Sequence, residues 1–320
     1  MQRRHHAETT AEYGWGFKAA TIRRPLAGIV SLALIVVACS GDESTSADTT
    51  TETPSPIVVT DMVYNQDPAQ VLDVHVPDGD GPFPTIMAIH GGGFYAGSKR
   101  DYSRHAEHFV DSGIAFVTID YRLAPSTTHP GQVEDVHCAL AWVHENADRY
   151  RFDPSNIVVM GGSAGGYLTG MLATANDRDR YLGDCPYDLP ADPLAGAVTL
   201  YGIFDYTDLD NHDYPPGLMG AASRLAGEPY NELSADMLAE MSPIEQIDGS
   251  EPPILAIHGT GDRTIPGAMS EGFVTALQAA GVDAELLLVE GNHGFDLQPL
   301  TAPPNGEVLA AIEQFVADIG

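Results

Sequence analysis

Positive charge is scarce in this chain. Its 320 residues include 15 lysine and arginine residues against 45 aspartate and glutamate residues, a formal net charge of −30. Residues 1–38 carry a surplus of three basic side chains, so the remainder is near −33, with Lys99 as its only lysine. Such a surface repels polyanions, which argues against nucleic-acid binding. We interpret the acidity as an adaptation to a salty exterior, where ions screen the repulsion; recognition of a cationic ligand is the alternative.

Cysteine is also rare, with three residues in the chain. No His, Cys and carboxylate side chains cluster at metal-ligand spacing, so the sequence predicts neither a metal nor another cofactor. Cys39 lies in an N-terminal segment where we expect it to be lipidated, as argued below, which leaves Cys138 and Cys185 as a pair. In an oxidising compartment such a pair forms a disulfide, and the alternative is two buried thiols.

The apolar run near the N-terminus is too short for a comfortable membrane span. Residues 26–38 follow Arg23 and Arg24 and end in Val-Val-Ala directly before Cys39. A basic segment, a short apolar core and a small residue before the break are typical of a secretory signal. The cysteine after the small residue resembles the lipobox of bacterial lipoproteins. We therefore expect residues 1–38 to be a lipoprotein signal peptide, with lipidated Cys39 anchoring an exported protein to the bacterial cell envelope. Plain signal cleavage or an uncleaved anchor are the alternatives.

The rest of the chain divides into a tether and one folded domain. Residues 39–56 consist mainly of Ser, Thr, Asp, Glu and Pro without apolar periodicity, which predicts a flexible acidic tether. From residue 57 to residue 320, strands and helices alternate without internal repeats. Expected strands lie near 57–64, 70–76, 85–90, 114–119, 157–161, 196–201, 253–258 and 284–289. Expected helices lie near 101–112, 132–149, 164–175, 267–280 and 306–319. This order predicts an α/β fold, with a mostly parallel sheet of about eight strands and helices on both faces.

A serine stands in the most informative motif of the domain. Ser163 is the centre of Gly161-Gly162-Ser163-Ala164-Gly165-Gly166, which follows an apolar strand and precedes a helix. A G-x-S-x-G motif in this context indicates a nucleophile elbow, a turn so tight that flanking side chains would collide. Glycine-rich turns of this kind also bind phosphate, but no G-K-[ST] follows here.

A glycine run after another strand supplies hydrogen-bond donors. Gly91, Gly92 and Gly93 follow His90 at the end of the strand near 85–90. Attack on an ester carbonyl builds an oxyanion, which backbone N–H groups of such a loop and of Ala164 would stabilise. We expect His90 to brace the loop by hydrogen bonding rather than to act as a base.

A histidine and an aspartate complete the predicted catalytic set. His293 follows the last strand and is expected to take the proton of Ser163. Asp262 follows the strand near 253–258 and is expected to orient that imidazole, with Asp205 as the rival. His258 is expected to be a packing or surface residue, and Asp296 to decorate the loop after His293.

Residues 57–320 resemble an α/β-hydrolase of the bacterial esterase type. Similarity to the hormone-sensitive-lipase-like esterases rests on His90-Gly-Gly-Gly-Phe and on Asp120-Tyr-Arg-Leu-Ala-Pro, although that group usually has Asp at the position of Gly162. Similarity to the carbohydrate acetyl/feruloyl esterase-like group rests on the elbow and on two later motifs. These are Ser242-Pro-Ile, and His258-Gly-Thr-Gly-Asp with Ile265-Pro266. The resemblance implies the following site residues: Ser163, Asp262 and His293 as the triad, and Gly92, Gly93 and Ala164 as oxyanion donors.

Together these features predict a serine carboxylesterase. Its expected substrates are small-molecule or carbohydrate esters of acetyl or feruloyl type, with residues 204–252 as a lid over the pocket. An amidase or arylformamidase is one alternative, because the same triad serves both bonds. A non-catalytic binding module on the same fold is the other. The oligomeric state does not follow from the sequence.

Overall fold

The computed structural model describes residues 55–175, 178–210 and 214–320. The expected signal peptide, Cys39 and nearly all of the expected tether lie outside these residues. None of the helices in the described ranges is long and apolar enough to cross a membrane.

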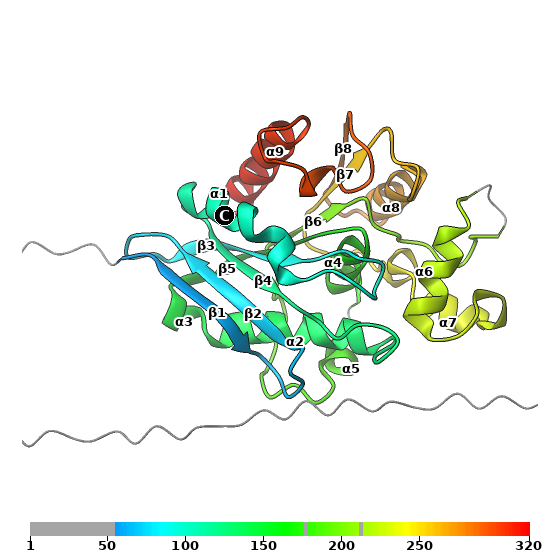
Figure 1. Ribbon diagram of the computed structural model, residues 1–320, viewed down its shortest axis with the longest axis horizontal. Helices are drawn as coiled ribbons and strands as arrows, with labels where there is room; N and C mark the ends of the chain where they lie inside the picture. Colours follow the sequence, from blue (N-terminus) through cyan, green and yellow to red (C-terminus); the bar gives the residue numbers. More distant parts are fainter. Residues whose placement is uncertain (1–54, 176–177, 211–213) are drawn as a thin grey trace, which may run out of the picture. The chain divides into compact units, whose positions relative to one another are not determined.

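Eight strands in the described part of the chain form a single sheet in the order β1-β2-β4-β3-β5-β6-β7-β8 (Figure 1). The strands are β1 Ile57–Val63, β2 Val71–Val76, β3 Phe83–Ile89, β4 Ala115–Ile119, β5 Phe152–Gly162, β6 Gly196–Leu200, β7 Ile254–Gly259 and β8 Ala284–Val289. β2 pairs antiparallel with both β1 and β4, and all other neighbours are parallel. The predicted mostly parallel sheet is thus confirmed, although β5 begins five residues earlier than its apolar run suggested.

The central strands are apolar because both of their faces are covered. Along β3, Ile86 and Ala88 face one core, whereas Met87 and Ile89 face the other, as the two-residue period of a strand requires. Helices α1 and α9 cover the first face, and α2, α4 and α8 cover the second (Figure 1). The bounds of these helices are α1 Ser103–Asp111, α2 Gly131–Glu145, α4 Ala164–Thr174, α8 Ala268–Ala279 and α9 Asn305–Asp318.

Shorter helices lie in the connections. They are α3 Ala147–Tyr150, α5 Arg178–Leu182, α6 Gly217–Ala226 and α7 Ala235–Glu240. The last two belong to the long connection from β6 to β7, within residues 204–252 that the sequence predicts as a lid. Buried side chains of α6, such as Leu218 and Leu225, pack on the core below it.

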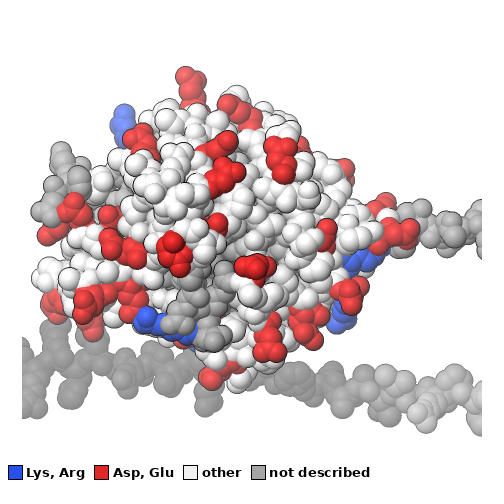
Figure 2. All heavy atoms as spheres, turned by 180° about the vertical axis from the view of Figure 1, so that it is seen from behind, with Lys and Arg blue, Asp and Glu red and all other residues white. Residues whose placement is uncertain are grey.

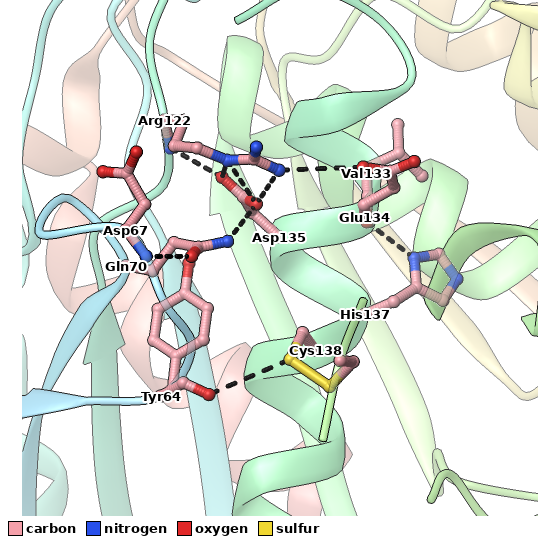
Figure 3. Close-up of a disulfide and its surroundings, with 10 residues drawn as sticks. Tyr64, Asp67, Gln70, Arg122, Val133, Glu134, Asp135, His137 and Cys138 are labelled. Atoms are coloured by element: carbon pink, nitrogen blue, oxygen red, sulfur yellow. Dashed lines mark hydrogen bonds and ion pairs between the residues drawn. A yellow bond between two sulfur atoms is a disulfide. The ribbon is translucent and has the colours of Figure 1, made fainter. Parts of the chain in front are cut away.

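A disulfide joins Cys138 on α2 to Cys185 in the connection that precedes β6 (Figure 3). Of the two alternatives that the sequence leaves open for this pair, the structure has the disulfide. The bond links residues separated by 47 positions and lies beside a buried polar cluster. In that cluster Arg122 pairs with the buried carboxylate of Asp135 at 2.6 Å, and Gln70 donates to the same carboxylate at 2.6 Å. The arginine of the Asp-Tyr-Arg-Leu-Ala-Pro motif therefore fastens the loop after β4 to α2.

Candidate active site

Ser163 lies in a strained turn between β5 and α4. Its backbone has φ of 58°, a left-handed value that is unfavourable for residues with a Cβ. A Cβ on Gly165 would lie 2.0 Å from the carbonyl oxygen of Ile89, and one on Gly161 would lie 2.5 Å from the carbonyl oxygen of Gly165. These two glycines are therefore required by close backbone packing, as expected for a nucleophile elbow.

A chain of two hydrogen bonds connects Ser163, His293 and Asp262. The Nε2 atom of His293 lies 2.9 Å from Ser163 Oγ, and its Nδ1 atom lies 2.7 Å from Asp262 Oδ2. The three residues follow β5, β8 and β7, whose carboxyl ends lie at the same edge of the parallel sheet. The fold thus brings together the three side chains that the sequence predicts as a triad.

The carboxylate of Asp262 is buried and held by several donors. Its Oδ1 atom accepts from the backbone N–H groups of Thr264 and Ile265, at 2.8 and 3.0 Å. Burial by itself would raise the pKa of Asp262, but hydrogen bonds from His258, His293 and the backbone of Ile265 outweigh burial and lower the pKa well below its usual range. The carboxylate of Asp262 is therefore an anion at neutral pH and can accept a hydrogen bond from the imidazole N–H of His293.

His258 packs in the core, and it also touches Asp262. Its side chain is fully buried, with Nδ1 2.8 Å from Ser270 Oγ and Nε2 2.9 Å from the carbonyl oxygen of Ile265. The same Nε2 atom lies 3.5 Å from Asp262 Oδ2. The sequence pattern does not predict this contact between His258 and Asp262, because His258 stands at the end of an apolar strand.

The rival aspartate makes local contacts instead. Asp205 Oδ1 accepts from the backbone N–H of Thr207 at 2.7 Å and from its hydroxyl at 2.6 Å. These bonds close a short turn after β6. The partner of His293 is Asp262, so the geometry favours Asp262 over Asp205.

The glycine loop lies against the elbow with its backbone donors available. A Cβ on Gly91 would come within 2.7 Å of the Gly162 carbonyl oxygen, so the two segments are in direct contact. Gly92 and Gly93 have φ of 111° and 59°. Within the described residues no backbone carbonyl accepts from the N–H of Gly92, Gly93 or Ala164. All three predicted oxyanion donors are thus free to bind a ligand.

His90 braces this loop, as expected. It is buried, its Nδ1 lies 2.7 Å from the carbonyl oxygen of Gly91, and its ring stacks on Tyr121 with centroids 4.4 Å apart. Burial is the main cause that lowers the pKa of His90. A neutral, stacked imidazole suits a structural role.

Asp296 is not the loop decoration that the sequence suggested. Its carboxyl group is buried and accepts hydrogen bonds from the phenols of Tyr201 and Tyr102, the latter at 3.2 Å. Burial raises the pKa of Asp296 above its ordinary value, although the two phenols oppose the effect. A Cβ on Gly162 would lie 2.6 Å from the Tyr201 hydroxyl, so this phenol occupies the space beside the elbow. An acidic residue three positions after His293 was the only sequence signal of this network.

Two side chains of the predicted triad, Ser163 and His293, line a cleft of about 320 Å³. Its walls include the glycine loop, Ser163, His293 and the Tyr–Asp–Tyr network. Two exposed apolar side chains, Tyr95 and Leu297, stand at its rim together with Arg224. Among the residues that the structure describes, no three His, Cys, Asp or Glu side chains gather in a way that would hold a metal ion.

The chain is similar to known esterases of bacteria. It is 32% identical over 251 residues to a probable carboxylic ester hydrolase, LipM, of Mycobacterium tuberculosis, covering 76% of this chain and 56% of that protein. It is 30% identical over 268 residues to Esterase LipC of the same organism, covering 81% and 64%. The chain thus spans between about half and two thirds of the length of these relatives.

A solved structure shares the fold. A truncated form of a carbohydrate esterase from gut microbiota superposes with a TM-score of 0.71 at 24% identity, covering 84% of this chain and 98% of that one. Residues 72–277 match the BD-FAE family and include the glycine loop, the elbow and Asp262. On this match, and with the fold described above, the chain belongs to the BD-FAE family of α/β-hydrolases.

Proposed function

We propose that the protein is a serine carboxylesterase that works through an acyl-enzyme on Ser163. The observation that carries the proposal is the pair of hydrogen bonds from Ser163 to His293 and from His293 to Asp262. A serine hydroxyl is a poor nucleophile at neutral pH and needs a base within hydrogen-bond reach. The membership of the BD-FAE family and the ester hydrolases among its relatives support the same reaction.

Acylation begins at the Ser163 hydroxyl. As Oγ attacks the ester carbonyl carbon, its proton passes to Nε2 of His293, which faces it at 2.9 Å. The carbonyl oxygen becomes an oxyanion, and the free N–H groups of Gly92, Gly93 and Ala164 would donate to it. When the tetrahedral intermediate collapses, the imidazolium returns the proton to the leaving alcohol, and the acyl group stays on Oγ.

Deacylation repeats these steps with water. His293 removes a proton from a water molecule as the oxygen attacks the acyl carbonyl. The second intermediate collapses, the acid leaves, and the proton on Nε2 returns to Ser163 Oγ. In both halves the carboxylate of Asp262 accepts a hydrogen bond from Nδ1–H of His293, which fixes the tautomer and stabilises the imidazolium.

The proposed substrates are short-chain esters or carbohydrate-linked esters of the acetyl or feruloyl type. The cleft of about 320 Å³ has room for a small acyl group, and the exposed side chains of Tyr95 and Leu297 give an acyl or aryl group an apolar contact at its rim. The similarity of the elbow and of the Asp262 loop to carbohydrate acetyl and feruloyl esterases favours these classes.

We also propose that the enzyme acts outside the cytoplasm, anchored by lipid on Cys39. The support is the sequence before Cys39 and the disulfide between Cys138 and Cys185, because disulfides persist in oxidising compartments. The acidic segment 39–56 would then connect the anchor to the catalytic domain.

Turnover of p-nitrophenyl acetate and butyrate by the parent and by Ser163→Ala tests the proposed reaction. The variant deletes one oxygen, so we expect an unchanged melting temperature and a loss of kcat on the order of 10⁴- to 10⁶-fold. A fluorophosphonate should label Ser163 in the parent. Hydrolysis of aryl formamides but not of esters would instead make the protein an amidase, and the absence of any turnover would favour a binding module. A parallel screen of acetylated and feruloylated sugars tests the substrate class.

A further inference from the structure

A cation stands at the rim of the catalytic cleft. Arg224 comes from α6, in the connection between β6 and β7, and lines the same cleft as Ser163 and His293. Its Nε atom donates to the carbonyl oxygen of Gly93 at 3.1 Å, and its guanidinium lies over the ring of Tyr95, 5.0 Å from the centroid. These two contacts position the guanidinium beside the expected oxyanion donors.

The guanidinium has no acidic partner within the described residues. Arg122 pairs with Asp135, and Arg180 pairs with Glu240, whereas no carboxylate of residues 55–175, 178–210 and 214–320 forms an ion pair with Arg224. Since Nε alone is engaged by the loop, the two terminal nitrogens remain available. An arginine fork of this kind matches the two oxygens of a carboxylate.

The space beyond Arg224 can hold a part of the substrate that does not react. A second pocket, of about 690 Å³, shares Tyr95 and Arg224 with the catalytic cleft. Its remaining lining is mostly small or apolar, with Pro125 and Pro229 in the walls and Glu228 as its one acidic member. A substrate that reaches from Ser163 into this pocket therefore passes the guanidinium.

The acidity of the chain gives the position of the Arg224 guanidinium, at the rim of the cleft, its significance. The chain carries a formal net charge of −30, and carboxylates are spread over the face shown in Figure 2. Such a surface repels anionic substrates, so an anion would bind only where a local positive charge compensates. Arg224 supplies that charge at the entrance to the catalytic serine.

We propose that Arg224 binds a carboxylate on the non-reacting part of the substrate, so that the preferred substrates are esters that also carry a free carboxylate. This inference rests on the proposed esterase function. The guanidinium would form two charge-assisted hydrogen bonds with the carboxylate, while the apolar part of the substrate packs against Tyr95 and the proline walls.

Matched ester pairs test the inference on both sides of the scissile bond. For the acyl side, kcat/KM is compared between the p-nitrophenyl monoester of glutaric acid and p-nitrophenyl valerate. For the alcohol side, p-acetoxybenzoate is compared with p-acetoxybenzamide. The quantity compared is kcat/KM for the anionic member of a pair divided by kcat/KM for the neutral member. In at least one pair Arg224→Gln should lower this ratio by roughly tenfold. Added salt should reduce the parent's ratio, and Arg224→Lys should restore only part of it.

Arg149 provides a matched control, because its guanidinium also lies over a tyrosine ring, 5.2 Å from the centroid of Tyr150, but on α3 and outside the cleft. Arg149→Gln removes the same charge and should leave both ratios unchanged. If Arg224→Gln leaves the ratio of kcat/KM for anionic to neutral esters unchanged in both pairs, whether or not kcat/KM itself falls, the inference is overturned while the esterase proposal stands. If the parent hydrolyses none of the four esters faster than Ser163→Ala does, the esterase proposal fails, and this inference fails with it.

Discussion

Tyr201 donates a hydrogen bond to the buried carboxyl group of Asp296 and at the same time packs edge-on against His293, with ring centroids 4.7 Å apart. Tyr201 follows β6, and both partners lie in the loop after β8. The contact therefore ties the loop that carries His293 to the carboxyl end of β6. It also buries an acidic group whose pKa is raised by burial.

The raised pKa of Asp296 predicts a pH-dependent effect of Asp296→Asn on stability. A carboxyl group with a raised pKa in the folded state destabilises the protein increasingly as pH rises from the unfolded pKa through the folded one. The neutral amide of the variant does not ionise, so it removes this pH-dependent destabilisation. The melting temperature of the variant relative to the parent should therefore increase between about pH 4 and 7, by a few degrees if the difference is about 1 kcal/mol. A constant difference across this range would show that ionisation of Asp296 has no part in stability.

Asp262→Asn and Asp205→Asn separate the two candidate acids. The amide at position 262 favours the wrong imidazole tautomer, so we expect kcat to fall about 10⁴-fold. Among the described residues, the side chain of Asp205 bonds to Thr207 in its own turn, so its variant should keep most of the parent's activity. Steady-state kinetics of both variants on p-nitrophenyl butyrate make the comparison, with melting temperatures as the check on folding. The reverse order of losses would assign the acid to the loop after β6.

The acidic side of the pH–rate profile should be a single step. The lowered pKa of Asp262 keeps this group ionised above about pH 4, so it does not titrate in the working range. Its contribution to stability is present above its unfolded pKa and is lost only as pH falls toward the lower folded value. Because a histidine base must be neutral to accept a proton, kcat/KM should rise with pH in one step on the acidic side. A flat profile from pH 5 to 8 with a slow-leaving ester would contradict a histidine base.

Two glycine-to-alanine variants test the packing of the elbow. At Gly165 the added Cβ would lie 2.0 Å from the backbone oxygen of Ile89, so Gly165→Ala should displace the elbow and abolish activity or folding. At Gly272 on α8 nothing lies within 4 Å of the added Cβ. Gly272→Ala should therefore stabilise the helix by about 0.5–1 kcal/mol and keep full activity. Thermal melts and esterase assays check both, and an active, stable Gly165→Ala protein would show that the turn tolerates a side chain.

Lipidation of Cys39 can be tested in an expressing bacterium. A diacyl or triacyl cysteine anchors a protein firmly, so the parent should fractionate with membranes and incorporate radiolabelled palmitate. Cys39→Ser should release active enzyme into the soluble fraction, because the proposed anchor lies outside the folded residues that carry the proposed active site. Failure of the parent to incorporate palmitate would leave plain signal cleavage or an uncleaved anchor as the explanation of residues 1–38.

The sequence by itself determined the sheet and the elbow, because both depend on local patterns. Short apolar runs, separated by segments with helical patterns, predict all eight strands. Glycines on both sides of Ser163 predict a turn that no other residue type permits. The start of β5 was missed because residues 152–156 include Pro154 and polar side chains, which interrupt the apolar run.

Tertiary structure decided which side chains meet at the carboxyl edge of the sheet. Ser163 and His293 are 130 positions apart, and Tyr201 and Asp296 are 95 apart, so their contacts depend on the order of the strands rather than on neighbouring residues. The pairing of His293 with Asp262 rather than Asp205, the bond between Cys138 and Cys185, and the contact of Arg224 with the glycine loop depend on the tertiary structure in the same way. A local pattern sets the conformation of a segment, whereas burial and hydrogen bonding between distant segments set its partners.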